Sequence, residues 1–386
     1  MDADKPKEMP EIHKGLVGIY IDKSNICHID GENGKLYYRG YQLKTLCEKS
    51  TFEEVTFLIL FGRLPTFSEL KSFKERLVRE RDIPDRILMI LKSFPRNTTR
   101  IELLRTAISA LSLYDEDDYD YSEIANLNKG IRIIAKIPTI LAYSHRIKGN
   151  VPLVEPLKDT KVSHAANFYY MMTGKVPDIE RAFDLSLIIQ AEHDLNASTF
   201  ASRLTVSTLS DIFSAVVSAI GALRGPLHGG ANERVIEMLK DIATKDRIIP
   251  YIEDRLARKE KVFGFGHRIY KQHDPRTFIL KEQSKLFWDK VADRHTVHDN
   301  LHEMAEIIED YMYKRKKLYP NVDFYSAPLL HALGVPSPLF TPLFAASRAV
   351  GWIAHAIEQL RDNKLIRPRL YYVGDVDREY IDIEKR

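Results

Sequence analysis

Hydrophobic residues along most of this chain recur every three to four positions, the spacing of amphipathic helices. The exception is the segment 16–39, where apolar and polar residues alternate around a "DGENG" turn, a pattern that predicts short strands. We expect helices near 50–62, from 66 onward, and near 84–93, 98–114, 127–147, 161–174, 178–194, 205–223, 231–243, 249–260, 275–289, 297–317, 325–332 and 339–361. The sequence therefore predicts an all-α protein with a short N-terminal β element.

Two of the expected helices begin at residue pairs with capping-box spacing. Ser50 is followed three positions later by Glu53, and Thr66 by Glu69. In a capping box, the hydroxyl of the first residue and the carboxylate of the last accept hydrogen bonds from each other's backbone N–H groups. We therefore expect both helices to start at these pairs.

The composition narrows the class of protein without identifying it. The chain has 386 residues, 44% hydrophobic and 29% charged, and its net charge of +3 balances 57 basic against 54 acidic residues. This balance gives no reason to expect nucleic acid or an anionic membrane as a partner. The N-terminal residues have neither an apolar signal core nor transit-peptide character, and two cysteines, Cys27 and Cys47, suit a reducing compartment. We expect a cytoplasmic protein.

Three histidines and an aspartate lie where the helical pattern breaks. They are His193 in "AEHDLNAST", His228 in "GPLHGGANE", His267 in "FGFGHRIYKQHDPR" and Asp323 in "YPNVDFYSA". Glycines beside His228 and His267 allow a ligand or a second backbone to approach closely. Structural roles stay open: a hydrogen-bonded core histidine at 193, a capping turn at 228 and an N-cap at 323.

The surroundings of two of these histidines suggest different chemistry. His228 precedes the helix "ANERVIEMLK", whose positive end disfavours imidazolium, so we expect a neutral hydrogen-bond donor. Near His267, the basic residues Arg268, Lys271 and Arg276 and the upstream run "RLARKEK" form either a solvated face or a site for a phosphate-rich ligand.

Arg348 is the only formal charge in the apolar stretch "PLFTPLFAASRAVGWIAHAI" at 338–357. A helix this apolar is expected to be buried on most faces. A buried guanidinium without an anion costs several kcal/mol. Either a protein carboxylate or a ligand carboxylate should therefore lie near Arg348.

Taken together, these motifs resemble the citrate synthase family over nearly the whole chain. The resemblance begins at "GLVGIYIDKSNICHIDGENGKLYYRGY", continues through "FEEVTFLILFGRLPT" and ends at "LIRPRLYYVG". Between these stretches, "GPLHGGANE", "GFGHRIYKQHDPR" and "PNVDFYS" occur in the order and spacing of the family. The short N-terminal part resembles the compact dimeric type and not the longer type that NADH regulates.

The resemblance implies a role for each candidate residue. Asp323 would remove a proton from the methyl group of acetyl-CoA, His228 would donate a hydrogen bond to the thioester oxygen, and His267 would bind the oxaloacetate carbonyl and act as the acid. The oxaloacetate carboxylates would be held by His193, Arg276, Arg348 and, from the other subunit, Arg367. Our candidates for binding CoA are Arg258, Lys259, Lys261, Phe263, Gly264 and Gly266. Neither a metal nor a separate cofactor is expected, since acetyl-CoA is itself a substrate.

The resemblance also implies a two-domain homodimer. The large domain would comprise 1–230 and 334–386, and the small domain, 231–333, would close over the substrates. "NKLIRPRLYYVG" follows the long apolar helix, and Pro368 bars helix continuation, so the tail is expected to be an extended arm that can cross a two-fold interface.

Three other functions remain open from the sequence. A 2-methylcitrate synthase, or an enzyme of dual specificity, differs by one methylene in the acyl group, which a pocket discriminates by only about 1–3 kcal/mol. The pairs His193–Asp194 and His273–Asp274 would suit an α-helical metal-dependent phosphohydrolase, although the histidines in Gly-rich turns lack the i, i+4 ligand spacing. A helical scaffold without catalytic activity is the third alternative.

Overall fold

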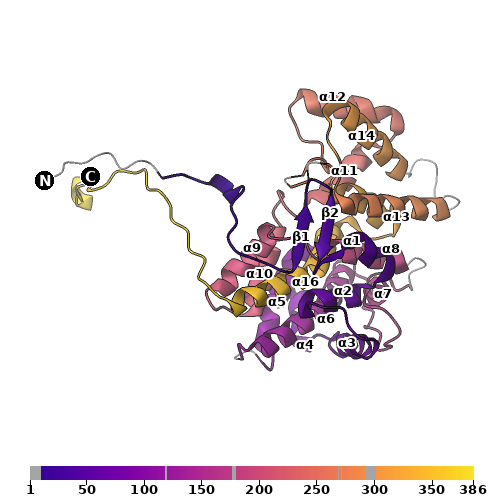
Figure 1. Cartoon of the computed structure of the whole chain (residues 1–386), viewed down its shortest axis with the longest axis horizontal. Helices are drawn as coiled ribbons and strands as arrows, with labels where there is room; N and C mark the ends of the chain where they lie inside the picture. The colour runs from indigo at the N-terminus through magenta and orange to yellow at the C-terminus, as the bar shows by residue number, and fades with distance from the viewer. Residues whose placement is uncertain (1–9, 118–119, 176–179, 268, 271, 292–300) are drawn as a thin grey trace.

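The computed structural model describes residues 10–117, 120–175, 180–267, 269–270, 272–291 with side chains to 288, and 301–386. Within these ranges the chain is mainly helical, as predicted (Figure 1). The helices are α1 (Leu43–Lys49), α2 (Phe52–Phe61), α3 (Phe67–Arg79), α4 (Asp85–Ser93), α5 (Arg100–Leu111), α6 (Glu123–Lys148), α7 (His164–Thr173), α8 (Glu180–Gln190), α9 (Ala197–Ser207), α10 (Ile212–Leu223), α11 (Ala231–Ile242), α12 (Ile248–Ala257), α13 (Pro275–Val291), α14 (Leu301–Lys316), α15 (Val322–Ala332) and α16 (Phe340–Arg361). The beginnings of the helices expected at 178–194 and 297–317 lie outside the described residues.

The N-terminal β element is a three-stranded antiparallel sheet in the order β1-β2-β3. Its strands are β1 (Cys27–Asp30), β2 (Lys35–Tyr38) and β3 (Tyr41–Gln42), and Cys27 pairs with Tyr38. The expectation of strands from residue 16 is wrong, because the alternating stretch before Cys27 has no partner strand in the described structure and is mostly exposed. The hydroxyl of the buried Tyr38 donates to the carbonyl of Glu192 (2.9 Å), which ties the sheet to the turn between α8 and α9.

The core is arranged around α16, which packs against α2, α6, α8, α9 and α10. The helix expected at 205–223 is two helices, because Asp211 begins α10 by accepting the backbone N–H of Ser214 (2.8 Å). The turn between them places Leu209 at φ +63°. The sequence pattern also did not predict the short α1.

The two capping predictions have different outcomes. Thr66 and Glu69 form the reciprocal capping box of α3. At α2 the prediction is wrong by one residue, because the cap is Thr51, whose hydroxyl accepts the N–H of Glu54 (3.4 Å). Glu53 is instead buried and accepts the backbone N–H of His164 (2.9 Å).

Helices α11 to α15 form the part of the molecule drawn at the upper right of Figure 1. Within it α15 packs against α11, α13 and α14, and α12 packs against α14. These helices occupy the segment 231–333 that we predicted as the small domain. The exact domain boundaries stay a prediction.

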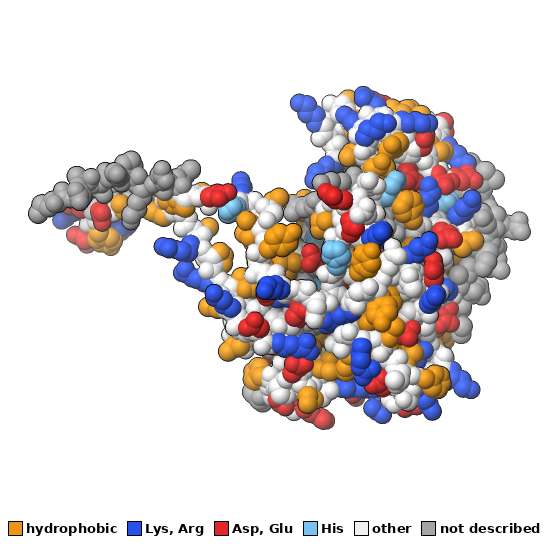
Figure 2. All heavy atoms as spheres, in the orientation of Figure 1, with side chains coloured by type: hydrophobic (Ala, Val, Ile, Leu, Met, Phe, Trp, Pro, Cys, Tyr) orange, Lys and Arg blue, Asp and Glu red, His pale blue; other side chains and the backbone are white. Residues whose placement is uncertain are grey.

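The two ends of the described chain leave the body together as extended arms (Figures 1 and 2). Both carry apolar side chains that are largely exposed, among them Val17 (79%) and Tyr20 (97%) in the N-terminal arm and Leu370 (99%) and Val373 (87%) in the C-terminal arm. Apolar side chains at such exposure do not contribute to the core of their own chain.

Candidate active site

Six of the predicted site residues come from six separate elements, and the histidines and the aspartate among them lie within electrostatic reach of Arg276, Arg348 or both. His193 lies in the α8–α9 turn, His228 in the α10–α11 turn, and His267 in the segment before α13. Arg276 is the second residue of α13, Asp323 the second of α15, and Arg348 lies in α16. The charge of Arg276 lowers the pKa of His193, His267 and Asp323, and the charge of Arg348 lowers the pKa of His193, His228 and Asp323.

His193 and His267 face each other around Tyr270. The rings of the two histidines have their centroids 5.4 Å apart, and Nε2 of His193 lies 3.3 Å from the Tyr270 hydroxyl. Nδ1 of His267 accepts the backbone N–H groups of Ile269 and Tyr270, both at 3.1 Å. In the neutral imidazole the proton is then on Nε2, so His267 presents a donor towards the centre of the site. Burial, followed by the charge of Arg276, lowers the pKa of His267 to about 4.

Arg276 is held in place by Asp274, two residues earlier. Its guanidinium donates to both carboxylate oxygens of Asp274, at 2.9 and 2.7 Å, and both side chains are almost fully buried. Nη2 of Arg276 also lies 3.5 Å from Nε2 of His267, at the outer limit of a hydrogen bond, so the two closer N–H groups on Nδ1 decide the tautomer of His267. The carboxylate of Asp274 is thus engaged by an arginine, and His273 packs its ring against Tyr319 (4.0 Å between centroids). Neither arrangement resembles a pair of metal ligands, and the described residues contain no group of three or more His, Cys, Asp and Glu side chains that could hold a metal ion.

His228 lies two residues before the N-cap of α11, which is Gly230. Its Nε2 contacts the hydroxyl of Ser198 at 2.8 Å and accepts the backbone N–H of Ser198 at 3.3 Å. Trp352 of α16 donates from Nε1 to the same hydroxyl (3.0 Å). Burial and then the charge of Arg348 lower the pKa of His228 to about 4, so this imidazole is neutral at pH 7.

Asp323 does not cap its helix, so the capping alternative is wrong. The N-cap of α15 is Asn321, whose side chain accepts the backbone N–H of Asp323 (3.1 Å). Oδ1 of Asp323 is buried and has no hydrogen-bond partner in the described structure. Burial raises the pKa of Asp323 to about 7, although the positive charges of Arg276 and Arg348 oppose this. A carboxylate this poorly solvated is more basic than one in water.

Arg348 is buried, with 1% of its surface exposed, as the apolar sequence around it predicted. Its Nε donates to the carbonyl of Gln190 (2.7 Å), and its guanidinium lies over the ring of Phe344 (4.8 Å to the centroid). Nη2 is buried without a hydrogen-bond partner in the described structure. A buried guanidinium with an unused N–H group is suited to bind a carboxylate.

The glycine-rich segment before His267 packs against the start of α15. Gly264 and Gly266 have φ of +82° and +83°, and a Cβ on Gly264 would lie 2.7 Å from the ring of Phe324. Gly266 donates from its backbone N–H to the carbonyl of Tyr319 (3.1 Å), and its own carbonyl accepts from Asn321 Nδ2 (3.1 Å). These contacts fix His267 relative to Asp323.

The basic CoA candidates lie at the surface of the same segment. Lys259 and Lys261 are exposed, whereas Arg258 forms ion pairs with Asp254 and Glu260. Phe263 is half-buried, and the guanidinium of Arg255 lies over its ring (5.2 Å to the centroid). The two other basic residues near His267, Arg268 and Lys271, lie outside the described residues.

Arg367 differs from the other residues predicted to hold oxaloacetate, because its own chain does not bring it to the site. The preceding residue, Ile366, donates its backbone N–H to the hydroxyl of Ser207 (3.1 Å), and Arg367 is exposed. Ser207 is the last residue of α9, whereas Ser198, next to His228, is the second. At 1.5 Å per helical residue, these ends are about 14 Å apart.

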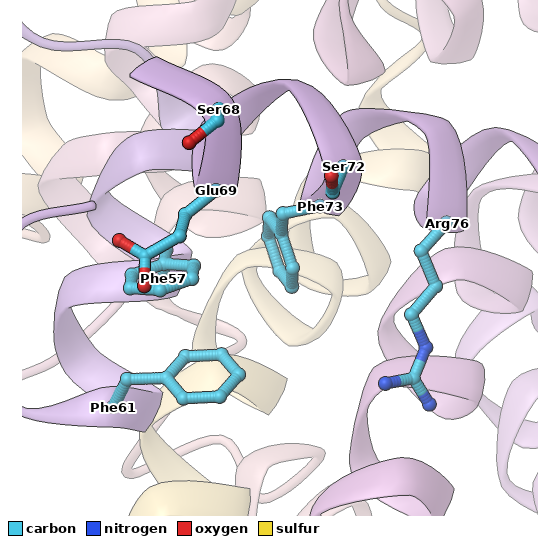
Figure 3. Close-up of a pocket in the computed structure, with 7 residues that line it drawn as sticks. All are labelled: Phe57, Phe61, Ser68, Glu69, Ser72, Phe73 and Arg76. Carbon is cyan, nitrogen blue, oxygen red and sulfur yellow. The ribbon is translucent and has the colours of Figure 1, made fainter. Parts of the chain in front are cut away.

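The pocket drawn in Figure 3 lies away from these residues. It measures about 330 Å³ and is lined by Phe57, Phe61, Ser68, Glu69, Ser72, Phe73 and Arg76 of α2 and α3. Its phenylalanine rings contact one another, with centroids 4.2 Å apart for Phe57 and Phe61. It shares no residue with the candidate site.

Sequence reasoning did not assign a supporting role to four residues of the site: Ser198, Tyr270, Glu192 and Asp274, the last of which it considered only as part of a metal-binding pair. Asp274 could have been found, because it directly precedes a helix that starts with Pro275 and Arg276. Ser198 lies in "NAST", which reads as a helix start, and nothing local indicates that its hydroxyl meets a histidine thirty residues away.

None of the helices in the described part of the chain is long and apolar enough to cross a membrane.

Comparisons with known proteins agree on one family. Residues 15–369 match the family described as citrate synthase, C-terminal domain. The chain is 42% identical to a citrate synthase of Haloferax volcanii, over 97% of this chain and 99% of that protein. It is 38% identical to a 2-methylcitrate synthase of Shewanella oneidensis, over 96% and 97% of the two chains. The structure of the ternary complex of carboxymethyl coenzyme A and oxaloacetate with citrate synthase from Thermoplasma acidophilum superposes with a TM-score of 0.92, at 32% identity over 98% and 100% of the two chains. The chain belongs to the citrate synthase family.

Proposed function

We propose that this protein condenses acetyl-CoA with oxaloacetate and hydrolyses the resulting citryl-CoA to citrate and CoA. The observation that carries the proposal is the placement of Asp323. Its buried Oδ1 has no partner in the described structure, and it lies in the field of Arg276 and Arg348, the two arginines that also act on His267 and His228. This is the arrangement that proton abstraction next to a carbonyl requires: a base, a donor for the oxygen and cations for a dianionic partner.

In the first step, Asp323 removes a proton from the methyl group of acetyl-CoA. A carboxylate is too weak a base to form a free enolate, so the thioester oxygen must be stabilised as its charge develops. His228 would supply this from Nδ1, because its Nε2 already accepts the Ser198 N–H. Its neutral state makes it a suitable donor, since it donates a hydrogen bond without having to lose a full proton.

In the second step, the enol carbon attacks the carbonyl carbon of oxaloacetate, and the carbonyl oxygen takes up a proton. His267 would donate that proton from Nε2 as a neutral imidazole, because its lowered pKa of about 4 excludes imidazolium at pH 7. His193, Arg276 and Arg348 would hold the carboxylates of oxaloacetate. Water then attacks the thioester carbonyl of citryl-CoA: its oxygen enters the new carboxylate of citrate, one of its protons restores His267, and the proton held by Asp323 leaves with the thiolate as the thiol of CoA.

Lys259 and Lys261, with Arg258, Phe263, Gly264 and Gly266, would bind CoA. The support is their position on the segment that ends at His267 and their exposed positive charges. The ligands named for the Thermoplasma acidophilum structure are consistent with the same pair of substrates. No metal and no separate cofactor enters the proposed steps, and we propose a cytoplasmic location on the basis of the composition.

We also propose a homodimer in which Arg367 of one chain completes the site of the other. Two observations support this: Arg367 is exposed far from the site of its own chain, and the arms carry exposed apolar side chains that a second chain would cover. Closure of the segment 231–333 over the rest would bring Asp323 and His267 to the substrates.

The alternative acyl substrate is propionyl-CoA, as the name of the Shewanella oneidensis relative suggests. A comparison of kcat/KM for acetyl-CoA and propionyl-CoA, both with oxaloacetate, distinguishes the two. We expect acetyl-CoA to be preferred. A preference for propionyl-CoA would change the substrate, and release of thiol from neither would overturn the proposed function.

A further inference from the structure

The carboxylate of Glu192 occupies a notch in α16 that only glycine leaves open. Glu192 is fully buried, in the turn that also carries His193. The backbone N–H of Gly351 donates to the carbonyl of Ala191 (3.2 Å), and a Cβ on Gly351 would lie 2.0 Å from Oε2 of Glu192. Three and four residues from this notch, on the same face of α16, are Arg348 and His355.

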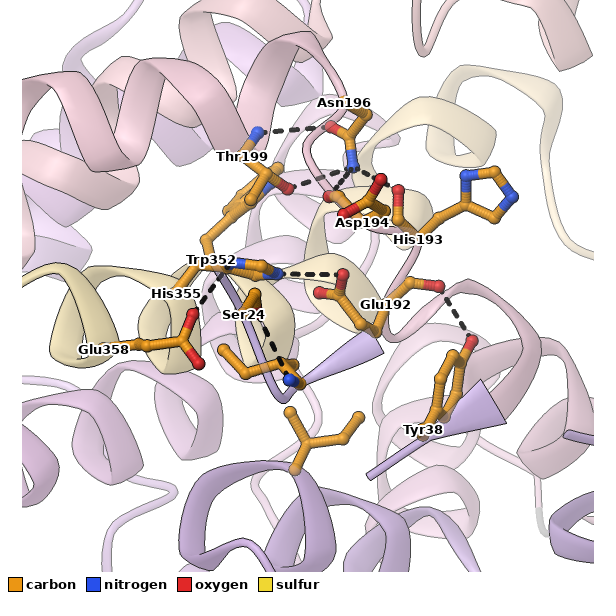
Figure 4. Close-up of polar contacts among 12 residues, drawn as sticks. Ser24, Tyr38, Glu192, His193, Asp194, Asn196, Thr199, Trp352, His355 and Glu358 are labelled. Carbon is orange, nitrogen blue, oxygen red and sulfur yellow. Dashed lines mark hydrogen bonds and ion pairs between the residues drawn. The ribbon is translucent and has the colours of Figure 1, made fainter. Parts of the chain in front are cut away.

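His355 orients Glu192 through a hydrogen bond to one of its carboxylate oxygens. Nε2 of His355 lies 3.1 Å from Oε1 of Glu192, as Figure 4 shows. Nδ1 lies 3.2 Å from Nη1 of Arg203, and arginine can only donate. Nδ1 therefore faces a donor, and Nε2 is the ring nitrogen that donates to Glu192. Oε2 of Glu358 lies 4.0 Å from Nδ1, beyond hydrogen-bond distance.

The cation that remains for Glu192 is Arg348. Oε2 of Glu192 and Nη2 of Arg348 are both buried, and neither has a hydrogen-bond partner in the described structure. Burial lowers the pKa of Arg348, and the charge of Glu192 is the strongest influence that opposes this. The other buried arginine of the site, Arg276, already has Asp274 as its direct partner. The two unpaired groups thus balance each other's charge through space.

We propose that Glu192 is a positioning residue that acts as the counter-charge of Arg348 while the substrate site is empty. It lets a guanidinium be buried before substrate arrives, and because no hydrogen bond joins the two, Nη2 remains available to a substrate carboxylate. This inference rests on the proposed function, in which Arg348 binds oxaloacetate. Once a dianion is bound, Glu192 becomes a second anion near the same cation, so it should weaken oxaloacetate binding.

The first test needs no ligand. Thermal unfolding is measured for Glu192→Gln, Arg348→Met and the double variant. Each single change leaves one buried charge uncompensated, so each should lower Tm by about 4 °C, and the double variant should regain most of this loss. Glu53→Gln is the matched control: it removes another buried carboxylate, and its effect should add to that of Arg348→Met. If a single variant does not fold, recovery of folding in the double variant supports the coupling just as well.

The second test is calorimetric titration with oxaloacetate. Glu192→Gln should bind oxaloacetate about 10-fold more tightly than the unmodified protein, because one repulsive charge is removed. A structural role alone would give additive Tm losses and unchanged or weaker binding, and either result overturns the inference. A third outcome combines non-additive Tm losses with normal binding of oxaloacetate by Arg348→Met. It would reject both the substrate role of Arg348 and the inference, and Glu192 and Arg348 would then form a purely structural ion pair.

Discussion

The imidazole of His228 is held by Ser198 in the tautomer that the proposed chemistry needs. The backbone N–H of Ser198 lies 3.3 Å from Nε2 of His228 and can only donate to it. Its hydroxyl lies 2.8 Å from the same nitrogen and accepts from Trp352 (3.0 Å). The backbone N–H, which Nε2 shares with Oδ1 of Asn196, favours the tautomer in which Nε2 accepts and Nδ1 carries the proton, while the hydroxyl also donates to Oδ1 of Asn196 (2.7 Å). Ser198 thereby controls which nitrogen of His228 can donate to a substrate.

Ser198→Ala should lower kcat by about 10-fold and leave KM for oxaloacetate unchanged. The variant keeps the backbone N–H but removes the shorter hydroxyl contact, so the ring is held by one contact and is free to rotate, which weakens stabilisation of the enol but not the binding of carboxylates. Ser202→Ala is the matched control, because Ser202 is a buried serine of the same helix whose hydroxyl donates to the Trp352 carbonyl (3.2 Å). Equal losses in the two variants, or a loss confined to KM, would mean that Ser198 only packs.

Asp323→Asn should lower kcat by at least about 100-fold, the lower end of general-base effects. In the unmodified protein, kcat/KM should rise with pH through about 7. The base must be ionised, burial raises the pKa of Asp323 to about 7, and His228 and His267, with pKa lowered to about 4, are already neutral there. A pH–rate profile that is flat between pH 5 and 8, or a variant with near-normal turnover, would remove Asp323 from this role.

Ionisation of Asp323 should lower the free energy of unfolding of the protein at high pH. The pKa of Asp323 is raised above its unfolded value, so the unfolded state releases its proton first and stability falls as pH rises from about 4 to about 7. Asp323→Asn removes this cost, so the variant should be more stable than the parent, and by more at pH 8 than at pH 5. Denaturant unfolding at the two pH values measures the difference. A gain that is equal at both would mean that the carboxylate is ionised without penalty.

The sequence predicted the parts of this structure that local chemistry determines. The capping box at Thr66, the apolar helix around Arg348 and the breaks that carry His228 and His267 are all set by nearby residues. Prediction from the hydrophobic pattern failed where tertiary contacts determine the local structure. The turn before Asp211 divides a stretch of uniform composition, and the two strand-like residues Ile19 and Ile21 find no partner strand in the described structure.

The supporting residues of the site were harder to predict than its charged ones. An arginine in an apolar helix is conspicuous because its burial is costly, whereas Ser198 and Gly351 are common residue types at unremarkable positions. Their roles depend on which segments meet in space: the α10–α11 turn at Ser198, and the turn carrying Glu192 at Gly351. Such pairings span more than one hundred residues in the case of Gly351, and no local pattern encodes them.

The shared-site proposal predicts that activity returns when two inactive dimers exchange subunits. Arg367→Ala and His267→Ala should each give a nearly inactive homodimer, because every site lacks one essential group. In a hybrid dimer, one site collects both lesions. The other combines the intact His267 of one chain with the intact Arg367 of its partner, so about half of the hybrid's sites should work. Purification with two different affinity tags isolates the hybrid, and its turnover is compared with that of each parent.

The hybrid also distinguishes the opposite arrangement. If Arg367 served the site of its own chain, each site of the hybrid would carry one lesion and no activity would return. A mixture of His267→Ala and Asp323→Ala chains is the matched control, since both residues belong to the same chain's site and their hybrids should stay inactive. Activity in that control would show that each subunit contributes more residues to its partner's site than Arg367 of the C-terminal arm. An inactive Arg367→Ala and His267→Ala hybrid would place Arg367 outside the partner's site and leave the roles of His228, His267 and Asp323 unchanged.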